Sequence, residues 1–256
     1  AVGARGLSGD GYRGHVFWDA DVFVLPFFAA THAAAARAML EYRVRRLPQA
    51  IARARAEGRL GARFPWESAG NGEEVTPPSV VDSRGQLVPI RTGSAEVHIV
   101  GDVAWSAWCY GAWTGDDAFR RGSGHRLLVE TARYWASRIR VDPGGVAHLF
   151  GVIGPDEYHE PVDDDAYTNV LARWNLRVAA ESVERYGDPD VEAAERSRWR
   201  DLAVTRWRED ATRDCWGMFV YLRDVETGEY WSATYQPTLR AMKGYEAIFT
   251  QARAEF

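Results

Sequence analysis

The sequence predicts an all-α protein whose helical hairpins close into a ring, an α/α toroid. Three observations support this fold class. Apolar residues recur at helical spacing in most long segments. These segments alternate regularly with loops, and the loops lengthen at every second junction. Hairpins that close into a ring bury both of their layers and collect the long loops at one end. A plain helical bundle or a solenoid is the alternative architecture.

The first half of the chain contains four expected helical segments, separated by one long irregular segment. Asp19 lies near the start of the first helix, and Pro26 is expected to kink it. The expected helices span residues 21–31, 32–46, 49–57 and 96–113. Residues 61–93 have no regular pattern, and a loop of this length inside a compact domain is usually functional.

The second half begins at residues 114–117, where one helix is expected to end and the next to begin. Gly115 is followed there by two aspartates. One or two helices are expected over 117–139, a turn or short strand over 141–150, an amphipathic helix over 165–186 and a charged helix over 189–207. Beyond these, a hairpin around residues 226–229 and a final helix after Pro237 are expected.

Composition limits the function classes. The 256 residues carry a net charge of −5 and are 46% hydrophobic, which suits one sizeable core. No basic patch points to nucleic acid. Residues 22–36 are apolar, but Pro26 and His32 interrupt them, so neither a membrane span nor a signal peptide is expected. The two cysteines, Cys109 and Cys215, do not imply a disulfide framework, and a cytoplasmic location is expected.

Residues 151–160 form a loop that carries acids and rings together. Two glycines and a proline exclude a helix or strand. Adjacent Asp156 and Glu157 repel each other, so one of them should hold its proton more tightly than a free acid, as a general acid requires. Tyr158 and His159 suggest a walled pocket around these acids. A solvated acidic turn is the alternative.

Tryptophan is unusually frequent, with 11 residues in the chain. An indole face matches the C–H face of a pyranose, although tryptophan is equally a core residue. The six histidines do not cluster with cysteines or acids at ligand spacings, so no metal site is expected.

Five motifs occur in the order known from one protein family. They are residues 6–19 (GLSGDGYRGHVFWD), 64–68 (FPWES), 96–99 (EVHI), 151–160 (GVIGPDEYHE) and 167–175 (YTNVLARWN). Together they closely resemble glycoside hydrolase family 65. That family contains maltose, trehalose and kojibiose phosphorylases and some hydrolases, such as acid trehalases. The resemblance covers residues 1–185 and weakens afterwards.

The resemblance implies an (α/α)6 barrel and assigns roles to single residues. The family's general acid falls on Glu157, and the Trp-Asp pair that grips the non-reducing glucose falls on Trp18 and Asp19. Five more residues are expected in the cleft, namely Trp66, Glu67, His159, Glu160 and Asn169. Two other sites have structural interpretations: His98 and Asp102 form a buried helix-capping or hydrogen-bonded pair, and His15 orders its loop.

The implied activity is inverting cleavage of an α-linked glucosyl disaccharide. In a phosphorylase, inorganic phosphate attacks as co-substrate, no cofactor is needed, and the products are β-glucose 1-phosphate and glucose. In a hydrolase, water attacks and a second carboxylate acts as base. A truncated fragment that only binds sugar is the third interpretation. The expected partners are the disaccharide and phosphate, with a homodimer as the assembly.

The chain departs from the family pattern at both ends. The N-terminal β-sandwich domain, the end of the barrel and the family's Lys-Gln pair on the glucose are not found; the single lysine, Lys243, precedes a glycine. Residues 1–256 are therefore interpreted as a partial catalytic domain, with 186–256 unassigned. Such a chain is expected to be weakly active or inert by itself.

Overall fold

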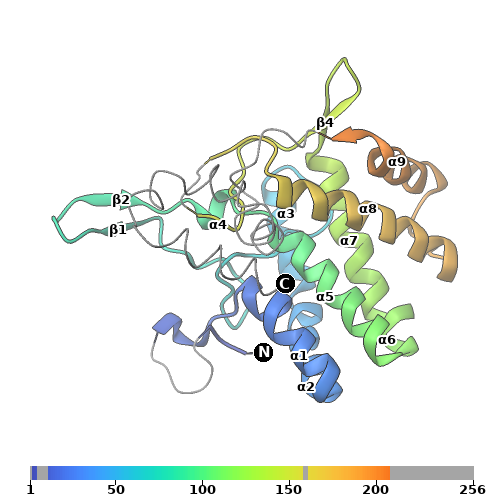
Figure 1. The fold of residues 1–256 in the computed structure, drawn as a ribbon, viewed down its shortest axis with the longest axis horizontal. Helices are drawn as coiled ribbons and strands as arrows, with labels where there is room; N and C mark the ends of the chain where they lie inside the picture. Colours follow the sequence, from blue (N-terminus) through green and yellow to red (C-terminus); the bar gives the residue numbers. More distant parts are fainter. Residues whose placement is uncertain (1, 5–10, 158–160, 208–256) are drawn as a thin grey trace, which may run out of the picture.

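The structure is a computed structural model that describes residues 2–4, 11–157 and 161–207 (Figure 1). The predicted hairpin at 226–229 and the helix after Pro237 lie outside these ranges, and so does Cys215. Cys109 is buried and carries a free thiol.

Three helical hairpins stand side by side and make up most of the described fold (Figure 1). The hairpins are α1 (Leu25–Thr31) with α2 (Ala33–Arg45), α5 (Ile99–Thr114) with α7 (Ser123–Arg138), and α8 (Ala166–Tyr186) with α9 (Ala193–Val204). Helix α5 packs against both α1 and α8, while α7 packs against α5, α8 and α9. The first helices of the pairs therefore form one layer and the second helices another. This two-layered arc confirms the all-α fold class and is consistent with an incomplete (α/α) barrel.

Shorter helices fill the connections. They are η1 (Gly11–Gly14), η2 (Ala20–Val24), α3 (Leu47–Ala56), α4 (Thr92–Ala95) and α6 (Asp117–Arg121). Helical backbone runs without a break from the π-helical turn η2 into α1, and Pro26 lies in this continuous stretch, two residues after η2. The kink expected at Pro26 stays a prediction.

Helix ends follow the signals in the sequence. Gly115 ends α5 in the left-handed region at φ 69°, and Asp116 then caps α6 by accepting a hydrogen bond from the amide of Phe119 at 2.9 Å. Asp165 caps α8 in the same way, through the amide of Thr168 at 2.7 Å, and Gly187 ends that helix.

Helix α5 lies between two buried hydrophobic clusters. Its residues Ile99 and Val103 belong to the cluster shared with α1, α2 and α3, while Val100 and Ala104 belong to the cluster shared with α7, α8 and α9. A helix buried on opposite faces needs apolar residues nearly all round. Helix α5 is therefore the central support of the described fold.

The expectation of an irregular segment at 61–93 was partly wrong. This segment contains an antiparallel hairpin of β1 (Ser79–Val81) and β2 (Leu87–Pro89). The Asp82 side chain accepts hydrogen bonds from the amides of Arg84 and Gln86, and Gly85 adopts φ 78°, which together build the turn. These strands are too short to show a period-2 pattern.

A second small sheet joins the later hairpins. Strand β4 (Val146–His148) pairs antiparallel with β3 (Arg140–Val141) and parallel with β5 (Arg206–Trp207). The strand expected within 141–150 is thereby confirmed. Among the helices that the structure describes, none combines the length and apolarity needed to cross a membrane.

Candidate active site

Backbone hydrogen bonds join the motif segments at one end of the helical layers. Val16 and Ser68 exchange two such bonds, at 3.0 and 2.9 Å, which places the Trp18–Asp19 segment beside the Trp66–Glu67 segment. The amide of Ile153 donates to the carbonyl of Ala95 at 3.0 Å. The loop that begins at Gly151 and carries Asp156 and Glu157, called the acid loop below, therefore runs beside the residues that lead into α5.

A buried polar cluster lies at the start of α5. The His98 ring faces two carboxylates, with Nδ1 2.6 Å from Asp102 Oδ2 and Nε2 2.8 Å from Glu96 Oε1. Tyr167, in the first turn of α8, donates its hydroxyl to Asp102 Oδ1 at 2.6 Å. His98, Asp102 and Glu96 are at most 2% exposed. The interpretation of His98 and Asp102 as a buried hydrogen-bonded pair is confirmed, and Glu96 and Tyr167 extend it.

Each ring nitrogen of His98 lies within hydrogen-bonding distance of a carboxyl group. Burial alone would lower the pKa of the imidazole, but Asp102 and Glu96 outweigh that effect and raise the pKa to about 10. Burial raises the pKa of Glu96 to about 7, although His98 opposes this rise. The cluster therefore holds a fixed imidazolium between one carboxylate and a second carboxyl group that titrates near neutrality.

Trp18 and Asp19 lie directly against this cluster. The Trp18 indole is buried and packs edge-to-face on the His98 ring, with centroids 4.9 Å apart, and it also contacts the Tyr167 ring at 6.5 Å. Asp19 keeps an exposed surface. Its pKa is raised by partial burial of its own carboxyl group and by the negative charge of Asp102, against the opposing effect of His98.

Trp66 and Glu67 lie on the neighbouring segment. The Trp66 ring is half-buried and packs edge-to-face on Phe17 at 4.9 Å. Its indole N–H faces Glu96 and favours the charged form of that carboxyl group. Glu67 is buried, and its Oε1 lies 2.7 Å from His15 Nδ1. This contact agrees with the interpretation that His15 orders its loop.

In the described part of the acid loop, Glu157 is exposed and its neighbour Asp156 is buried. Tyr158 and His159, the expected walls of the pocket, lie outside the described residues, so the walled pocket around both acids stays a prediction. The structure adds an electrostatic partner for Glu157, namely Glu96, which adjacency in the sequence did not reveal. The negative charge of Glu157 lies near enough to Glu96 to contribute to the rise in the pKa of Glu96. Glu157 thus lies within electrostatic range of the polar cluster that Trp18, Asp19 and Trp66 adjoin.

A close approach of the backbone fixes the base of the acid loop. A Cβ added at Gly154 would lie 2.5 Å from Asp165 Oδ1, so only glycine lets the loop pass the N-terminal cap of α8. Asn169 is buried in the first turn of the same helix. The remaining predicted site residues, His159 and Glu160, lie outside the described residues.

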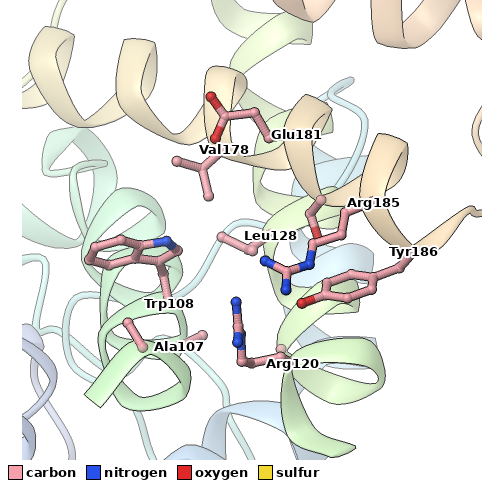
Figure 2. A pocket seen from close by; sticks show the side chains of 11 residues that line it. Ala107, Trp108, Arg120, Leu128, Val178, Glu181, Arg185 and Tyr186 are labelled. Atoms are coloured by element: carbon pink, nitrogen blue, oxygen red, sulfur yellow. The ribbon is translucent and has the colours of Figure 1, made fainter. Parts of the chain in front are cut away.

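A small cavity elsewhere is separate from this cluster. It has a volume of about 120 Å³ between α5, α7 and α8 and is lined by Trp108, Arg120, Arg185 and Tyr186, among others (Figure 2). Trp108 follows His98 by ten residues along α5, so it lies roughly 15 Å further along the helix axis. Among the residues described, no group of histidine, cysteine and acidic side chains could hold a metal ion.

This arrangement of paired helices defines the class of fold, an α/α-toroid domain. A model of the glycosyl hydrolase family 65 central catalytic domain matches residues 1–216. The chain therefore belongs to glycosyl hydrolase family 65. A second model, the glycosyl hydrolase 94 supersandwich domain, matches residues 191–256, most of which lie beyond the described part of the chain.

Individual relatives agree with this assignment. A kojibiose phosphorylase of Caldanaerobacter subterraneus subsp. tengcongensis is 42% identical over 214 residues, which are 82% of this chain and 28% of that protein. A kojibiose hydrolase of Flavobacterium johnsoniae is 41% identical over 71% of this chain and 25% of its own length. The solved structure of a putative kojibiose phosphorylase from human microbiome superposes with a TM-score of 0.69 at 24% identity, over 81% of this chain and 30% of its own, and shares the fold.

Proposed function

We propose that this chain carries the glucose-binding and proton-donating side of an inverting disaccharide phosphorylase. The substrate is an α-linked glucosyl disaccharide, and kojibiose is the first candidate because phosphorylases of that name are among the relatives. One observation carries the proposal: Trp18, Asp19 and Glu157, which come from distant segments, face the same buried cluster around His98.

In this mechanism, Glu157 gives its proton to the glycosidic oxygen as the bond to the anomeric carbon breaks. Inorganic phosphate attacks that carbon from the opposite face, so an α-glucoside yields β-glucose 1-phosphate and a free glucose. Phosphate is the nucleophile and brings its own charge, so this route requires neither a second catalytic carboxylate nor a cofactor. Trp18 and Asp19 hold the glucosyl ring while the bond is exchanged.

The electrostatics of the cluster support this chemistry. Cleavage passes through an oxocarbenium-like state, in which positive charge builds up on the glucosyl ring. Asp19, Asp102 and Glu96 surround a single imidazolium, so carboxyl groups outnumber the fixed cation beside the proposed glucose position. Such an arrangement favours a developing positive charge. Trp66, Glu67 and Asn169 are proposed to complete the cleft, with His159 and Glu160 contributing from the acid loop.

A hydrolase is the second candidate function, because the kojibiose hydrolase relative is nearly as similar as the phosphorylase. In that case water replaces phosphate, and another carboxylate must remove its proton. A cytoplasmic location and a homodimer remain predictions for the whole protein.

The test is a product assay with and without phosphate. The protein is incubated with kojibiose, maltose or trehalose, and the anomeric protons are followed by NMR. The expected result is a slow release of β-glucose 1-phosphate that occurs only when phosphate is present, because a partial catalytic domain is expected to be weakly active. Glucose release at the same rate without phosphate would replace the phosphorylase proposal by the hydrolase. Sugar binding without any turnover would leave only a binding role.

A further inference from the structure

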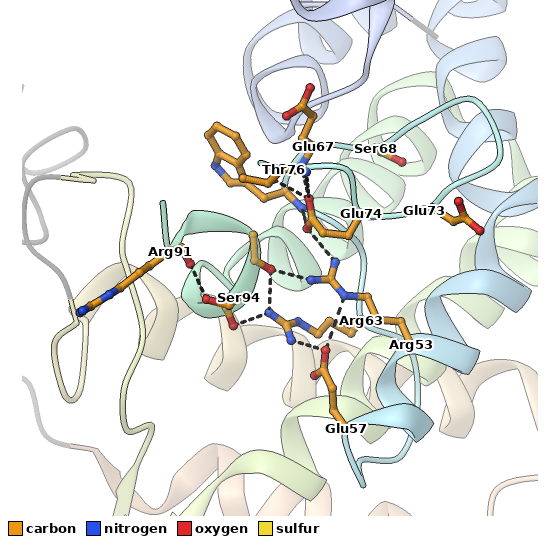
Figure 3. Close-up of polar contacts among 12 residues, drawn as sticks. Arg53, Glu57, Arg63, Glu67, Ser68, Glu73, Glu74, Thr76, Arg91 and Ser94 are labelled. Atoms are coloured by element: carbon orange, nitrogen blue, oxygen red, sulfur yellow. Dashed lines mark hydrogen bonds and ion pairs between the residues drawn. The ribbon is translucent and has the colours of Figure 1, made fainter. Parts of the chain in front are cut away.

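We infer that Glu74, which belongs to none of the recognised motifs, is the positioning residue that sets Trp66 and Glu67 in the sugar site. The inference rests on the proposed function and deepens it, because it names the group that holds one wall of that site. Glu74 lies between the Trp66–Glu67 segment and helix α3, and its side chain is 18% exposed (Figure 3).

Both carboxylate oxygens of Glu74 accept hydrogen bonds from the site segment. Oε2 accepts the backbone amide of Trp66 at 2.8 Å, and Oε1 accepts the amide of Glu67 at 3.1 Å. Oε1 also accepts the amide and the hydroxyl of Thr76, at 3.2 and 2.6 Å. A single carboxylate therefore fixes the backbone of two successive site residues. The Glu67 side chain is left to point the other way, toward His15.

The segment that leads into the His98 cluster is tied to the same carboxylate through Arg53. Arg53 donates from Nη1 to Glu74 Oε2 at 2.8 Å and from Nη2 to the carbonyl of Gly93 at 2.6 Å. Arg63 donates to the carbonyls of Gly93 and Ser94 at 3.2 and 2.6 Å and also pairs with Glu57. Gly93 and Ser94 lead directly into Glu96 and His98, so Arg53 and Glu74 join the Trp66–Glu67 segment to the segment that precedes the His98 cluster.

The contacts require a carboxylate at position 74. Burial lowers the pKa of Arg53, and neighbouring Arg63 lowers it further, while Glu74 opposes both effects. A glutamine at this position would keep one accepting oxygen and turn an NH₂ group toward the donors on the other side. If the NH₂ group took the place of Oε2, the Trp66 amide and Arg53 would lose their acceptor. If it took the place of Oε1, the Glu67 amide and Thr76 would lose theirs.

Glu74→Gln tests the inference, and Glu73→Gln is the matched control. Glu73 is the adjacent glutamate, is exposed and points away from the network (Figure 3). Amide hydrogen exchange is measured at Trp66 and Glu67, together with kcat and KM for the disaccharide. We expect Glu74→Gln to speed exchange at one or both amides by about 10- to 100-fold. We expect kcat/KM to fall by up to about 10²-fold, as misplacement of site groups does. Glu73→Gln should change neither quantity.

A double variant separates positioning from general stabilisation. In Trp66→Ala, most of what Glu74 positions is already lost, so adding Glu74→Gln should change kcat/KM far less than it does in the parent. The inference would be overturned if the effects of the two substitutions on kcat/KM were fully additive. It would also be overturned if amide exchange in Glu74→Gln were as slow as in the parent. If the parent protein turns over no sugar although the exchange result holds, the proposed function fails while the positioning of the Trp66 segment by Glu74 stands.

Discussion

The two walls of the candidate site are built in different ways. The wall that carries Trp66 and Glu67 is held by side chains, since Glu74 fixes its backbone and the Tyr42 hydroxyl lies 2.6 Å from Ser68 Oγ. The described part of the acid loop pairs through its backbone. Val152 and Val162 exchange two hydrogen bonds, at 2.9 and 2.8 Å, below the exposed Glu157.

This difference separates two tasks. A wall fixed by partly buried charges loses little entropy when a ring binds against it, so it suits recognition. A proton donor must reach the glycosidic oxygen and exchange its own proton, and an exposed position at the end of a turn suits that work. Substitutions in the two walls should therefore affect binding and turnover unequally.

The largest expected effect is on turnover. Glu157→Gln should lower kcat by about 10²–10⁴-fold, the usual contribution of a general acid, and leave KM nearly unchanged. Asp19→Asn, on the glucose side, should weaken sugar binding by roughly 10- to 100-fold through a lost charge-assisted hydrogen bond. Steady-state kinetics and calorimetry check the pair. Equal loss of binding in both variants would contradict the division of tasks.

The next effect is on stability. His98→Ala would leave Glu96 and Asp102 buried without their shared cation, so unfolding free energy should fall by about 3–5 kcal/mol in urea titrations. His32→Ala is the control, because His32 is exposed and only caps α2, which is worth about 1 kcal/mol. Similar losses in both variants would show that the His98 cluster is not a charged network.

The pH dependence of stability has a definite sign. The pKa of His98 is raised from 6.5 to about 10, so the folded state holds this proton more tightly than the unfolded chain does. Its contribution is complete below pH 6.5 and is lost as the pH rises through about 10. The raised pKa of Glu96 has the same sign at lower pH, between 4.5 and about 7. Thermal unfolding across this range should show a slope that His98→Gln flattens.

The smallest effect compares one glycine in each wall. Gly154→Ala would push against Asp165, the cap of α8, so it should cost about 1–3 kcal/mol of stability and displace Glu157. Gly70, beside Trp66 and Glu67, has open space around its Cα, and Gly70→Ala should be nearly neutral. Calorimetric melting of both variants checks this contrast. A neutral Gly154→Ala would mean that the acid loop has room to shift.

Sequence reasoning predicted the helices well because their caps are local. Gly115, Asp116 and Asp165 act on residues within one turn, so the signal and the structure lie in the same short segment. The hairpin within residues 61–93 was missed because its strands have only three residues each. The motifs identified Trp18, Asp19 and Glu157, whose roles remain proposals.

The buried cluster was harder to predict, because it depends on distant segments. His98 and Asp102 are four residues apart, so their contact could be read from helix geometry. Tyr167 and Glu157 reach the cluster from residues more than fifty positions away. A signal existed in hindsight: Glu96, His98 and Asp102 are three ionisable residues in an otherwise apolar run, where buried charges must be paired.

The place of α5 in the sequence also delays burial of the first hydrophobic cluster while the chain is being synthesised. The first hydrophobic cluster includes residues of α1, α2 and α3, yet its closing face is supplied by Ile99 and Val103. Synthesis must add the 42 residues between Ala56 and Ile99 before that face exists, which takes roughly 2–8 s at ordinary elongation rates. During this interval the nascent α1–α3 segment presents apolar surface to the cytosol or to a chaperone, and its docking onto α5 is the earliest step that can hide it.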